Sequence, residues 1–246
     1  SQGTGRTGRL SSQAMTQATP KVKICGIRTL ADAQVAAQAG ADFIGLVFVP
    51  SRRRRLELDL ARELVEGLKS GPGGAPPVVG LFADQPLEEV NHAIETCNLD
   101  MVQLCGTESL DYCRDTKAEV IKVMHIPGSP SLESEDEMAQ RIKAYRDSGC
   151  IVTLDSLVEG LQGGTGESFD WSIAADLAGK GNAFILAGGL SPENISEAVA
   201  TVGPWGVDVS SGVETNGDKD HGKIRQFIIN AKKLPAMNSQ DQKSDD

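Results

Sequence analysis

The chain has 246 residues and a formal net charge of −10, with 24 Lys and Arg residues against 34 Asp and Glu residues. This length fits one large α/β domain. So acidic a chain lacks the basic surface that general nucleic-acid binding needs. Its sequence has no apolar run near the roughly 20 residues of a membrane-spanning helix. We therefore expect neither a nucleic-acid partner nor a membrane partner.

Five cysteines and three histidines bear on the compartment and on metal binding. The cysteines are odd in number and none shows C-x-x-C spacing, which favours free thiols in a reducing, cytoplasmic compartment over a disulfide framework. The spacing of a zinc site such as H-E-x-x-H does not occur. We therefore expect no metal and no other cofactor.

The two ends of the chain differ from its middle in composition. Residues 1–20 are rich in Ser, Gly, Thr and Gln, and residues 235–246 form a polar tail. Such segments bury too little apolar surface to fold, and the first has no apolar segment typical of a secretory signal. The expected folded unit is residues 21–234, between a disordered linker and a disordered tail.

Short apolar runs rich in β-branched residues alternate with longer amphipathic segments inside this unit. The expected strands are residues 21–25, 42–48, 77–82, 99–104, 119–124, 150–155, 183–187 and 206–210. The expected helices are residues 30–39, 58–69, 86–97, 108–116, 135–146, 171–177, 192–202 and 219–232. Nearly continuous apolar strands are typical of parallel strands covered on both faces.

Strict alternation of eight strands with eight helices predicts an α/β fold. A doubly wound open sheet is the competing architecture. The number of units, and the lack of a G-x-G-x-x-G turn after the first strand, favour a single closed (β/α)8 TIM barrel. The active site of such a barrel lies at the C-terminal ends of its strands, so the residues that end each strand are the candidates.

The first two expected strands end in residues that can carry chemistry. Cys25 closes the first strand; a buried cysteine is usually an inert small apolar side chain, but a thiol stabilised as its thiolate is a base. Four arginines, residues 52–55, follow the second strand. They form either a solvated charged face or a bidentate site for a substrate carboxylate or phosphate.

The sixth expected strand ends at Asp155, whose carboxylate is unfavourable to bury without partners. A catalytic carboxyl and a turn cap fit this position equally well. A glycine-rich loop follows and contains Gly163, Gly164 and Gly166. Its backbone amides either bind a phosphate or simply belong to a flexible loop.

The last two expected strands end in segments rich in glycine and serine. Loops at these positions often form the phosphate site of a TIM barrel, together with a helix N-terminus. Ordinary turns use the same residue types, but two such segments at consecutive strand ends favour phosphate binding. The candidates are Gly188, Gly189, Ser210, Ser211 and Gly212.

A series of motifs, taken together, resembles the phosphoribosylanthranilate isomerase family. They occur in order over nearly the whole expected folded unit, and as an ordered set they are highly specific. The motifs are KICG (23–26), GADFIGLVF (40–48), VPSRRRR (49–55), VGLF (79–82), LDMVQLCG (99–106), LD (154–155), GGTGESFDW (163–171), LAGGLSPENI (186–195) and GVDVSSGVETNGDKD (206–220).

The resemblance implies an Amadori rearrangement in tryptophan biosynthesis, in which N-(5-phosphoribosyl)anthranilate becomes 1-(2-carboxyphenylamino)-1-deoxyribulose 5-phosphate. It implies that Cys25 is the general base, that Asp155 is the general acid and that Arg54 binds the anthranilate carboxylate. It also assigns the phosphate to the three glycine and serine segments, residues 163–166, 188–189 and 210–212. Asp208 matches a site residue whose role we leave open.

Two positions depart from the family pattern, and a further feature concerns the start of the chain. Cys105 stands where the family commonly has histidine, and the run of arginines leaves Arg53 and Arg55 as alternatives to Arg54. In fungi this domain is often the C-terminal part of a multifunctional tryptophan-pathway protein. Residues 1–20 resemble an interdomain linker or an added segment, so we expect fusion to other pathway domains.

Two other functions fit the same fold. The histidine-pathway isomerase performs this rearrangement on a related phosphoribosyl substrate, but it uses two aspartates, so Cys25 argues against it. A catalytically silent phosphate-binding barrel that acts as a scaffold is the non-enzymatic alternative. The presence of both Cys25 and Asp155 argues against a silent barrel.

Overall fold

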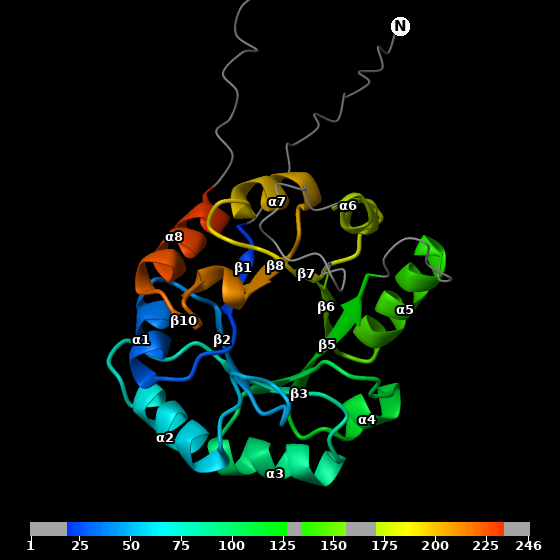
Figure 1. Cartoon of the computed structure of the whole chain (residues 1–246). Coiled ribbons are helices and arrows are strands. Elements are labelled where there is room, and N and C mark those ends of the chain that lie inside the picture. The colour runs from blue at the N-terminus through cyan, green and yellow to red at the C-terminus, as the bar shows by residue number, and fades with distance from the viewer. Residues whose placement is uncertain (1–18, 127–133, 156–170, 234–246) are drawn as a thin grey trace, which may run out of the picture.

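The computed structural model describes residues 19–126, 134–155 and 171–233. Eight parallel strands form a closed barrel in chain order, and helices surround it (Figure 1). The strands are β1 (Lys21–Ile24), β2 (Phe43–Val47), β3 (Val78–Phe82), β4 (Met101–Leu104), β5 (Glu119–His125), β6 (Ile151–Asp155), β7 (Ile185–Ala187) and β8 (Gly206–Val209). The predicted TIM barrel is confirmed.

The outer layer contains the helix expected after each strand. These helices are α1 (Leu30–Gln38), α2 (Leu58–Lys69), α3 (Leu87–Cys97), α4 (Leu110–Asp115), α5 (Glu135–Asp147), α6 (Ser172–Gly179), α7 (Ile195–Val202) and α8 (His221–Lys232). Within the described ranges, each helix is too short or too polar to cross a membrane. A large apolar core fills the space between the helices and the barrel.

The expected and observed boundaries differ most at α7. We expected this helix to begin at residue 192, whereas it begins at Ile195. The side chain of Asn194 accepts a hydrogen bond from the backbone N–H of Ser191 (2.8 Å). This local turn competes with a helical start, as asparagine side chains commonly do.

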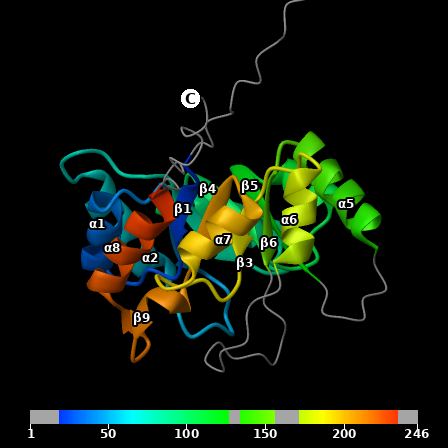
Figure 2. The ribbon, with the colours of Figure 1, turned by 90° about the horizontal axis from the view of Figure 1, so that it is seen from above.

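The chain forms a small element after β8 that was not among the expected helices and strands. A single 3-10 turn, η1 (Ser211–Val213), leads into an antiparallel hairpin of β9 (Glu214–Thr215) and β10 (Asp218–Lys219). Asn216 and Gly217 at its tip have positive φ (53° and 87°), and Asn-Gly is the strongest short hairpin signal. The hairpin projects at one end of the barrel (Figure 2).

The barrel interior changes in character along the strands. Side chains alternate between the two faces of a strand, so along β4 the residues Met101, Gln103 and then Cys105 share one face. The first of them belongs to an apolar cluster with Phe43, Val79, Ile121 and Ile185. Four strands, β1, β4, β6 and β8, also contribute buried polar residues, which are Lys23, Gln103, Thr153 and Asp208. A second apolar cluster follows at the C-terminal end, made by Cys25, Val47, Val49 and Leu81.

Candidate active site

Cys25 lies at the C-terminal end of β1, where its backbone N–H donates to the carbonyl of Val209 (2.8 Å). Its side chain is buried, and the absence of a Cβ at Gly45 leaves room for it, because a Cβ there would lie 3.0 Å from the Cys25 sulfur. Burial raises the pKa of the Cys25 thiol, and the ammonium of Lys23 partly offsets this. The thiolate therefore depends on nearby cations for its stability.

An ion pair lies next to Cys25 inside the barrel. The Nζ of Lys23 donates to Oδ2 of Asp208 at 2.9 Å, and both side chains are almost completely buried. Burial opposes the charge of Lys23, but the combined attraction of Asp208 and the neighbouring Cys25 outweighs it, so the pKa of Lys23 lies above its ordinary value. The other carboxylate oxygen, Oδ1, has no hydrogen-bond partner among the described residues. Lys23 was not among the expected site residues, although a lysine inside a buried strand is itself a signal.

Asp155 ends β6 on the same end of the barrel. It lies opposite His125, the last residue of β5, in the strand register. The Nδ1 of His125 is 3.9 Å from Oδ2 of Asp155, which is too long for a direct hydrogen bond. The side chains of Asp155 and His125 are 28% and 64% exposed, so the carboxyl is accessible at the barrel mouth. His125 was not a candidate, and its place at a strand end was the only signal.

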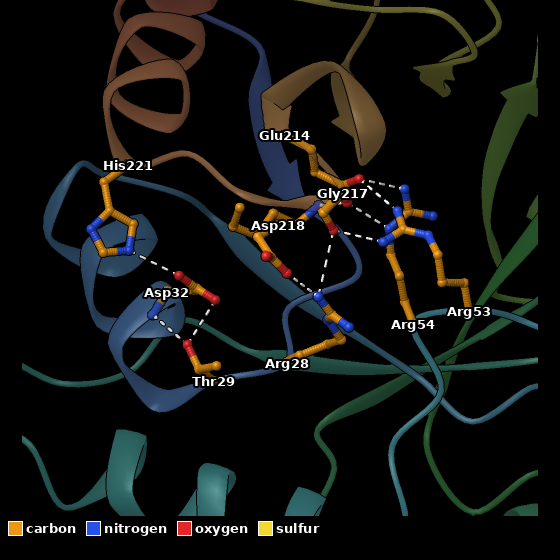
Figure 3. Close-up of polar contacts among 10 residues, drawn as sticks. Arg28, Thr29, Asp32, Arg53, Arg54, Glu214, Gly217, Asp218 and His221 are labelled. Atoms are coloured by element: carbon orange, nitrogen blue, oxygen red, sulfur yellow. Dashed lines mark hydrogen bonds and ion pairs between the residues drawn. The ribbon is translucent and has the colours of Figure 1, made fainter.

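Arg54 crosses the turn that follows Cys25. Gly26 in this turn has a φ of +74°, and a Cβ there would lie 2.4 Å from Cδ of Arg54 and 3.0 Å from Oγ of Ser210. Glycine is therefore what lets the arginine side chain pass over the backbone next to the thiol. In Figure 3 the guanidinium of Arg54 faces Glu214, with Nε donating to Oε1 at 2.6 Å and Nη2 donating to Oε2 at 2.8 Å.

The neighbouring arginines lie in different surroundings. Arg53 donates to Glu214 (2.8 Å) and to the carbonyl of Gly217 (2.6 Å), but its side chain is 51% exposed. Arg55 pairs with Glu57 at 3.3 Å and is also largely exposed. The side chain of Arg54 is only 22% exposed, and it is the one that packs over the turn after Cys25.

Glu214 links several cations of this region and was not among the expected site residues. Its side chain is 7% exposed and accepts hydrogen bonds from Arg53, Arg54 and Lys219. Burial alone would raise the pKa of Glu214, but the bonds from Arg54 and Lys219 lower it to about 2. Lys219 donates to Glu214 at 3.0 Å and to the backbone carbonyl of Ser210 at 2.8 Å.

The loops after β7 and β8 touch each other. Gly188 and Gly189 have positive φ (99° and 64°), a region that glycine adopts without strain. A Cβ at Gly212 would lie 1.9 Å from the carbonyl oxygen of Leu190. This contact brings the segments 188–189 and 210–212 together, as the hypothesis of a shared phosphate site requires. The other phosphate candidates, Gly163, Gly164 and Gly166, lie outside the described residues.

Cys105 packs against the apolar cluster that contains Cys25. Burial raises the pKa of its thiol to about 11, and its sulfur accepts a hydrogen bond from the Gln103 amide (3.6 Å). A neutral thiol therefore stands here in place of an ionisable imidazole. Together with Val47 and Leu81 it gives the barrel mouth an apolar wall suited to an aromatic ring.

Groups of ionisable side chains that could hold a metal ion were not found among residues 19–126, 134–155 and 171–233. All five cysteines lie within these ranges, and all are free thiols.

Known proteins match this chain over most of its length. The family model described as N-(5'-phosphoribosyl)anthranilate (PRA) isomerase matches residues 22–230. The chain belongs to this family. Membership decides between the two phosphoribosyl isomerase families in favour of the anthranilate enzymes over the histidine-pathway enzymes.

Curated relatives and solved structures agree with this assignment. The N-(5'-phosphoribosyl)anthranilate isomerase of Geobacter sp. (strain M21) is 44% identical over 87% of this chain and 98% of its own length. That of Dehalococcoides mccartyi is 42% identical over 86% of this chain and 95% of its own. The crystal structure of the Thermotoga maritima enzyme has a TM-score of 0.73 and 35% identity, covering 87% of this chain and 98% of that one.

A further solved member of the family contains a bound ligand. It is a phosphoribosyl anthranilate isomerase in complex with reduced 1-(o-carboxyphenylamino)-1-deoxyribulose 5-phosphate. It is 34% identical to this chain with a TM-score of 0.71, over 87% of this chain and 98% of its own.

Proposed function

We propose that this protein isomerises N-(5-phosphoribosyl)anthranilate to 1-(2-carboxyphenylamino)-1-deoxyribulose 5-phosphate in tryptophan biosynthesis. The observation that carries the proposal is the gathering of Cys25, Asp155 and Arg54 at the C-terminal end of one barrel, next to the loops after β7 and β8. The name of its relatives, which match nearly their whole length, supports the same substrate. The substrate is thus a small phosphorylated molecule that also carries a carboxylate.

The first chemical step, opening of the ribose ring, requires a general acid. Asp155 in its protonated form donates its proton to the ribose ring oxygen as the bond between C1 and that oxygen breaks. The lone pair of the anilino nitrogen forms the C1=N double bond of a protonated Schiff base. Asp155 is left as a carboxylate at the accessible mouth of the barrel.

The second step, removal of the proton at C2, requires a general base. The thiolate of Cys25 removes the proton from C2, and the electrons of that C–H bond form the C1=C2 bond of an enolamine, which neutralises the Schiff base. Tautomerisation then gives the ketone at C2. A positioned acid or base typically contributes ~10²–10⁴-fold in rate, and Lys23 supports the thiolate with its positive charge.

Binding groups hold the two ends of the substrate. Arg54 binds the anthranilate carboxylate, and the apolar wall beside Cys25 takes the aromatic ring. The phosphate is bound by Gly188, Gly189, Ser210, Ser211 and Gly212, together with the loop that contains Gly163, Gly164 and Gly166. Asp208 acts through Lys23, whose ammonium it fixes next to the thiol.

A fluorescence assay tests the proposal directly. Purified protein is mixed with phosphoribosylanthranilate, and the loss of substrate fluorescence is followed with a chelator present and no metal added. We expect turnover in the wild type and very little in a variant that combines Cys25→Ser with Asp155→Asn. A folded wild type that binds phosphate but shows no turnover would instead be the silent scaffold barrel.

The cellular setting and the domain limits belong to the same proposal. Five free thiols favour a reducing compartment, and we infer the cytoplasm. We take residues 21–234 as the catalytic unit, so deletion of residues 1–20 and 235–246 should leave turnover and the melting temperature nearly unchanged. Fusion to other tryptophan-pathway domains rests on the resemblance alone and stays a prediction.

A further inference from the structure

We propose that Glu214 is the positioning residue for the carboxylate-binding arginine, Arg54, and thereby sets affinity for the anthranilate end of the substrate. This inference rests on the proposed function and adds a residue to it. The hydrogen bonds of Glu214 go to cationic side chains and not to Cys25 or Asp155. Its effect on the reaction runs through the guanidinium that it holds.

The guanidinium of Arg54 binds Glu214 along one of its edges. A guanidinium presents five N–H donors in a planar fork, and each edge of the fork matches one carboxylate. Glu214 occupies the edge formed by Nε and Nη2 of Arg54, with bonds of 2.6 and 2.8 Å. Among the described residues, Nη1 has no hydrogen-bond partner. The edge that contains Nη1 is thus left for a second carboxylate, which is the group the substrate offers.

Glu214 also balances part of the positive charge around Arg54. One carboxylate, Glu214, pairs with three cations, Arg53, Arg54 and Lys219. Its pKa of about 2 keeps it ionised at any physiological pH, so the repulsion between the cations is always reduced. The cations still outnumber it, so the cluster keeps the positive potential that attracts an anionic substrate.

The fold explains why Glu214 can hold an arginine in one place. It begins the hairpin β9–β10, and Lys219 at the end of that hairpin ties the same carboxylate to the carbonyl of Ser210. Arg53 also binds the hairpin tip, through the carbonyl of Gly217 (Figure 3). A long, flexible arginine side chain loses much entropy when it is fixed, and an anchored carboxylate provides that fixation before substrate binds.

The test uses Glu214→Gln, which keeps the shape of the side chain but leaves one acceptor oxygen for the four donor nitrogens of three cationic side chains. We expect KM for phosphoribosylanthranilate to rise roughly tenfold or more, with a much smaller change in kcat, because an interaction common to ground state and transition state is weakened. Inhibition by inorganic phosphate should change little, since this ligand has no carboxylate. The Lys219 bond to Ser210 remains in this variant, so the phosphate loops keep their anchor.

A double-mutant cycle separates positioning from a general structural role. In an Arg54→Ala background, Glu214→Gln should have almost no further effect on KM, because the two residues act as one unit. Arg28→Gln is the matched control: it removes an ion pair to the same hairpin with exposed partners, and such pairs contribute little. This control should leave KM unchanged. If Glu214→Gln does not fold, Glu214→Asp, which keeps the charge one methylene further away, should show an intermediate rise in KM.

The possible results distinguish the two proposals. A wild type without turnover of phosphoribosylanthranilate overturns the proposed function, and with it this inference. An active wild type whose KM is unchanged by Glu214→Gln, or whose KM and phosphate inhibition weaken together, overturns the inference alone. Additive effects of Glu214→Gln and Arg54→Ala would do the same.

Discussion

Lys23 and Asp208 form an ion pair of 2.9 Å across the seam where β1 meets β8, on the face of β1 that also presents Cys25. Removing one member would leave the other charge buried without a partner. Lys23→Met should therefore lower the free energy of unfolding by about 3–5 kcal/mol. The double variant Lys23→Met/Asp208→Asn should lose much less. Urea denaturation of the three proteins measures this, and equal losses in the single and double variants would contradict it.

The proposed acid–base pair predicts an unusual pH dependence. The active form holds a carboxyl and a thiolate, and it has the same number of protons as the form with a carboxylate and a thiol. Carboxyls generally titrate far below thiols, so kcat/KM should be flat across the neutral range. It should fall in acid, where the thiol is protonated together with the carboxyl, and at high pH, where the carboxyl and the thiol have both lost their protons. The alkaline fall should lie above the ordinary thiol pKa of 9.0, because burial raises the pKa of Cys25. Alkylation of Cys25 by iodoacetamide should accelerate over the same alkaline range, and a decline of kcat/KM near neutrality would speak against this pair.

Substitution of the proposed acid or of the proposed base should depress turnover without unfolding the barrel. Cys25→Ser preserves the shape but raises the side-chain pKa far above neutrality, and Asp155→Asn removes the exchangeable proton. Each should reduce kcat by at least ~10²-fold. KM should change much less, because Arg54 and the phosphate loops remain. Near-normal turnover in a well-folded Cys25→Ser protein would show that another residue takes the proton.

Glycine at position 26 should matter for both folding and substrate binding. Gly26→Ala puts a Cβ 2.4 Å from Cδ of Arg54 at a φ of +74°, so the arginine must move and KM should rise. Gly40→Ala is the matched control, since Gly40 has a φ of +95° with nothing within 4 Å of the added Cβ. Both variants should lose ~1–2 kcal/mol of stability from the left-handed backbone, but only Gly26→Ala should raise KM. A normal KM in Gly26→Ala would show that Arg54 does not need its present path.

Glu214 should contribute to stability in a defined pH window. Its folded-state pKa of about 2 lies below the ordinary value of 4.5. The stabilisation is therefore complete above about pH 4.5 and is lost as the pH falls through 2. Wild type should exceed Glu214→Gln in unfolding free energy at pH 7, and the difference should shrink toward about pH 3. A difference that stays constant would mean that the charge of Glu214 adds nothing to folding.

The fold could be predicted from the sequence because its signals are periodic. Most strand runs, such as residues 78–82, are nearly continuous in apolar character, and helices such as α2 show an apolar stripe, so the alternation could be counted directly. Boundaries were less certain where side chains bind the backbone, as Asn194 does before α7. The Asn216-Gly217 turn was readable in principle, but β9 and β10 have only two residues each, too few for an alternating pattern.

Candidate site residues could be predicted where they lie at the C-terminal end of an expected strand, as Cys25 and Asp155 do. Residues whose role depends on a partner far away in the chain were not. Lys23 has meaning only beside Asp208, which follows it by 185 positions, and Glu214 only beside Arg54, 160 positions earlier. A local sequence pattern cannot reveal such a pairing, because the two residues come together only when the barrel closes.

The closing seam between β1 and β8 has a consequence for synthesis of the protein on the ribosome. The thiol of Cys25 is made early, but the carboxylate that fixes its neighbouring lysine, and the hairpin that fixes Arg54, come from the last part of the barrel. A nascent chain that has folded its first six or seven strands still lacks these partners. We therefore expect catalysis to begin only after β8 and the hairpin that follows it have been translated and have joined the barrel, so that activity reports on completion of the barrel in a way that helix content does not.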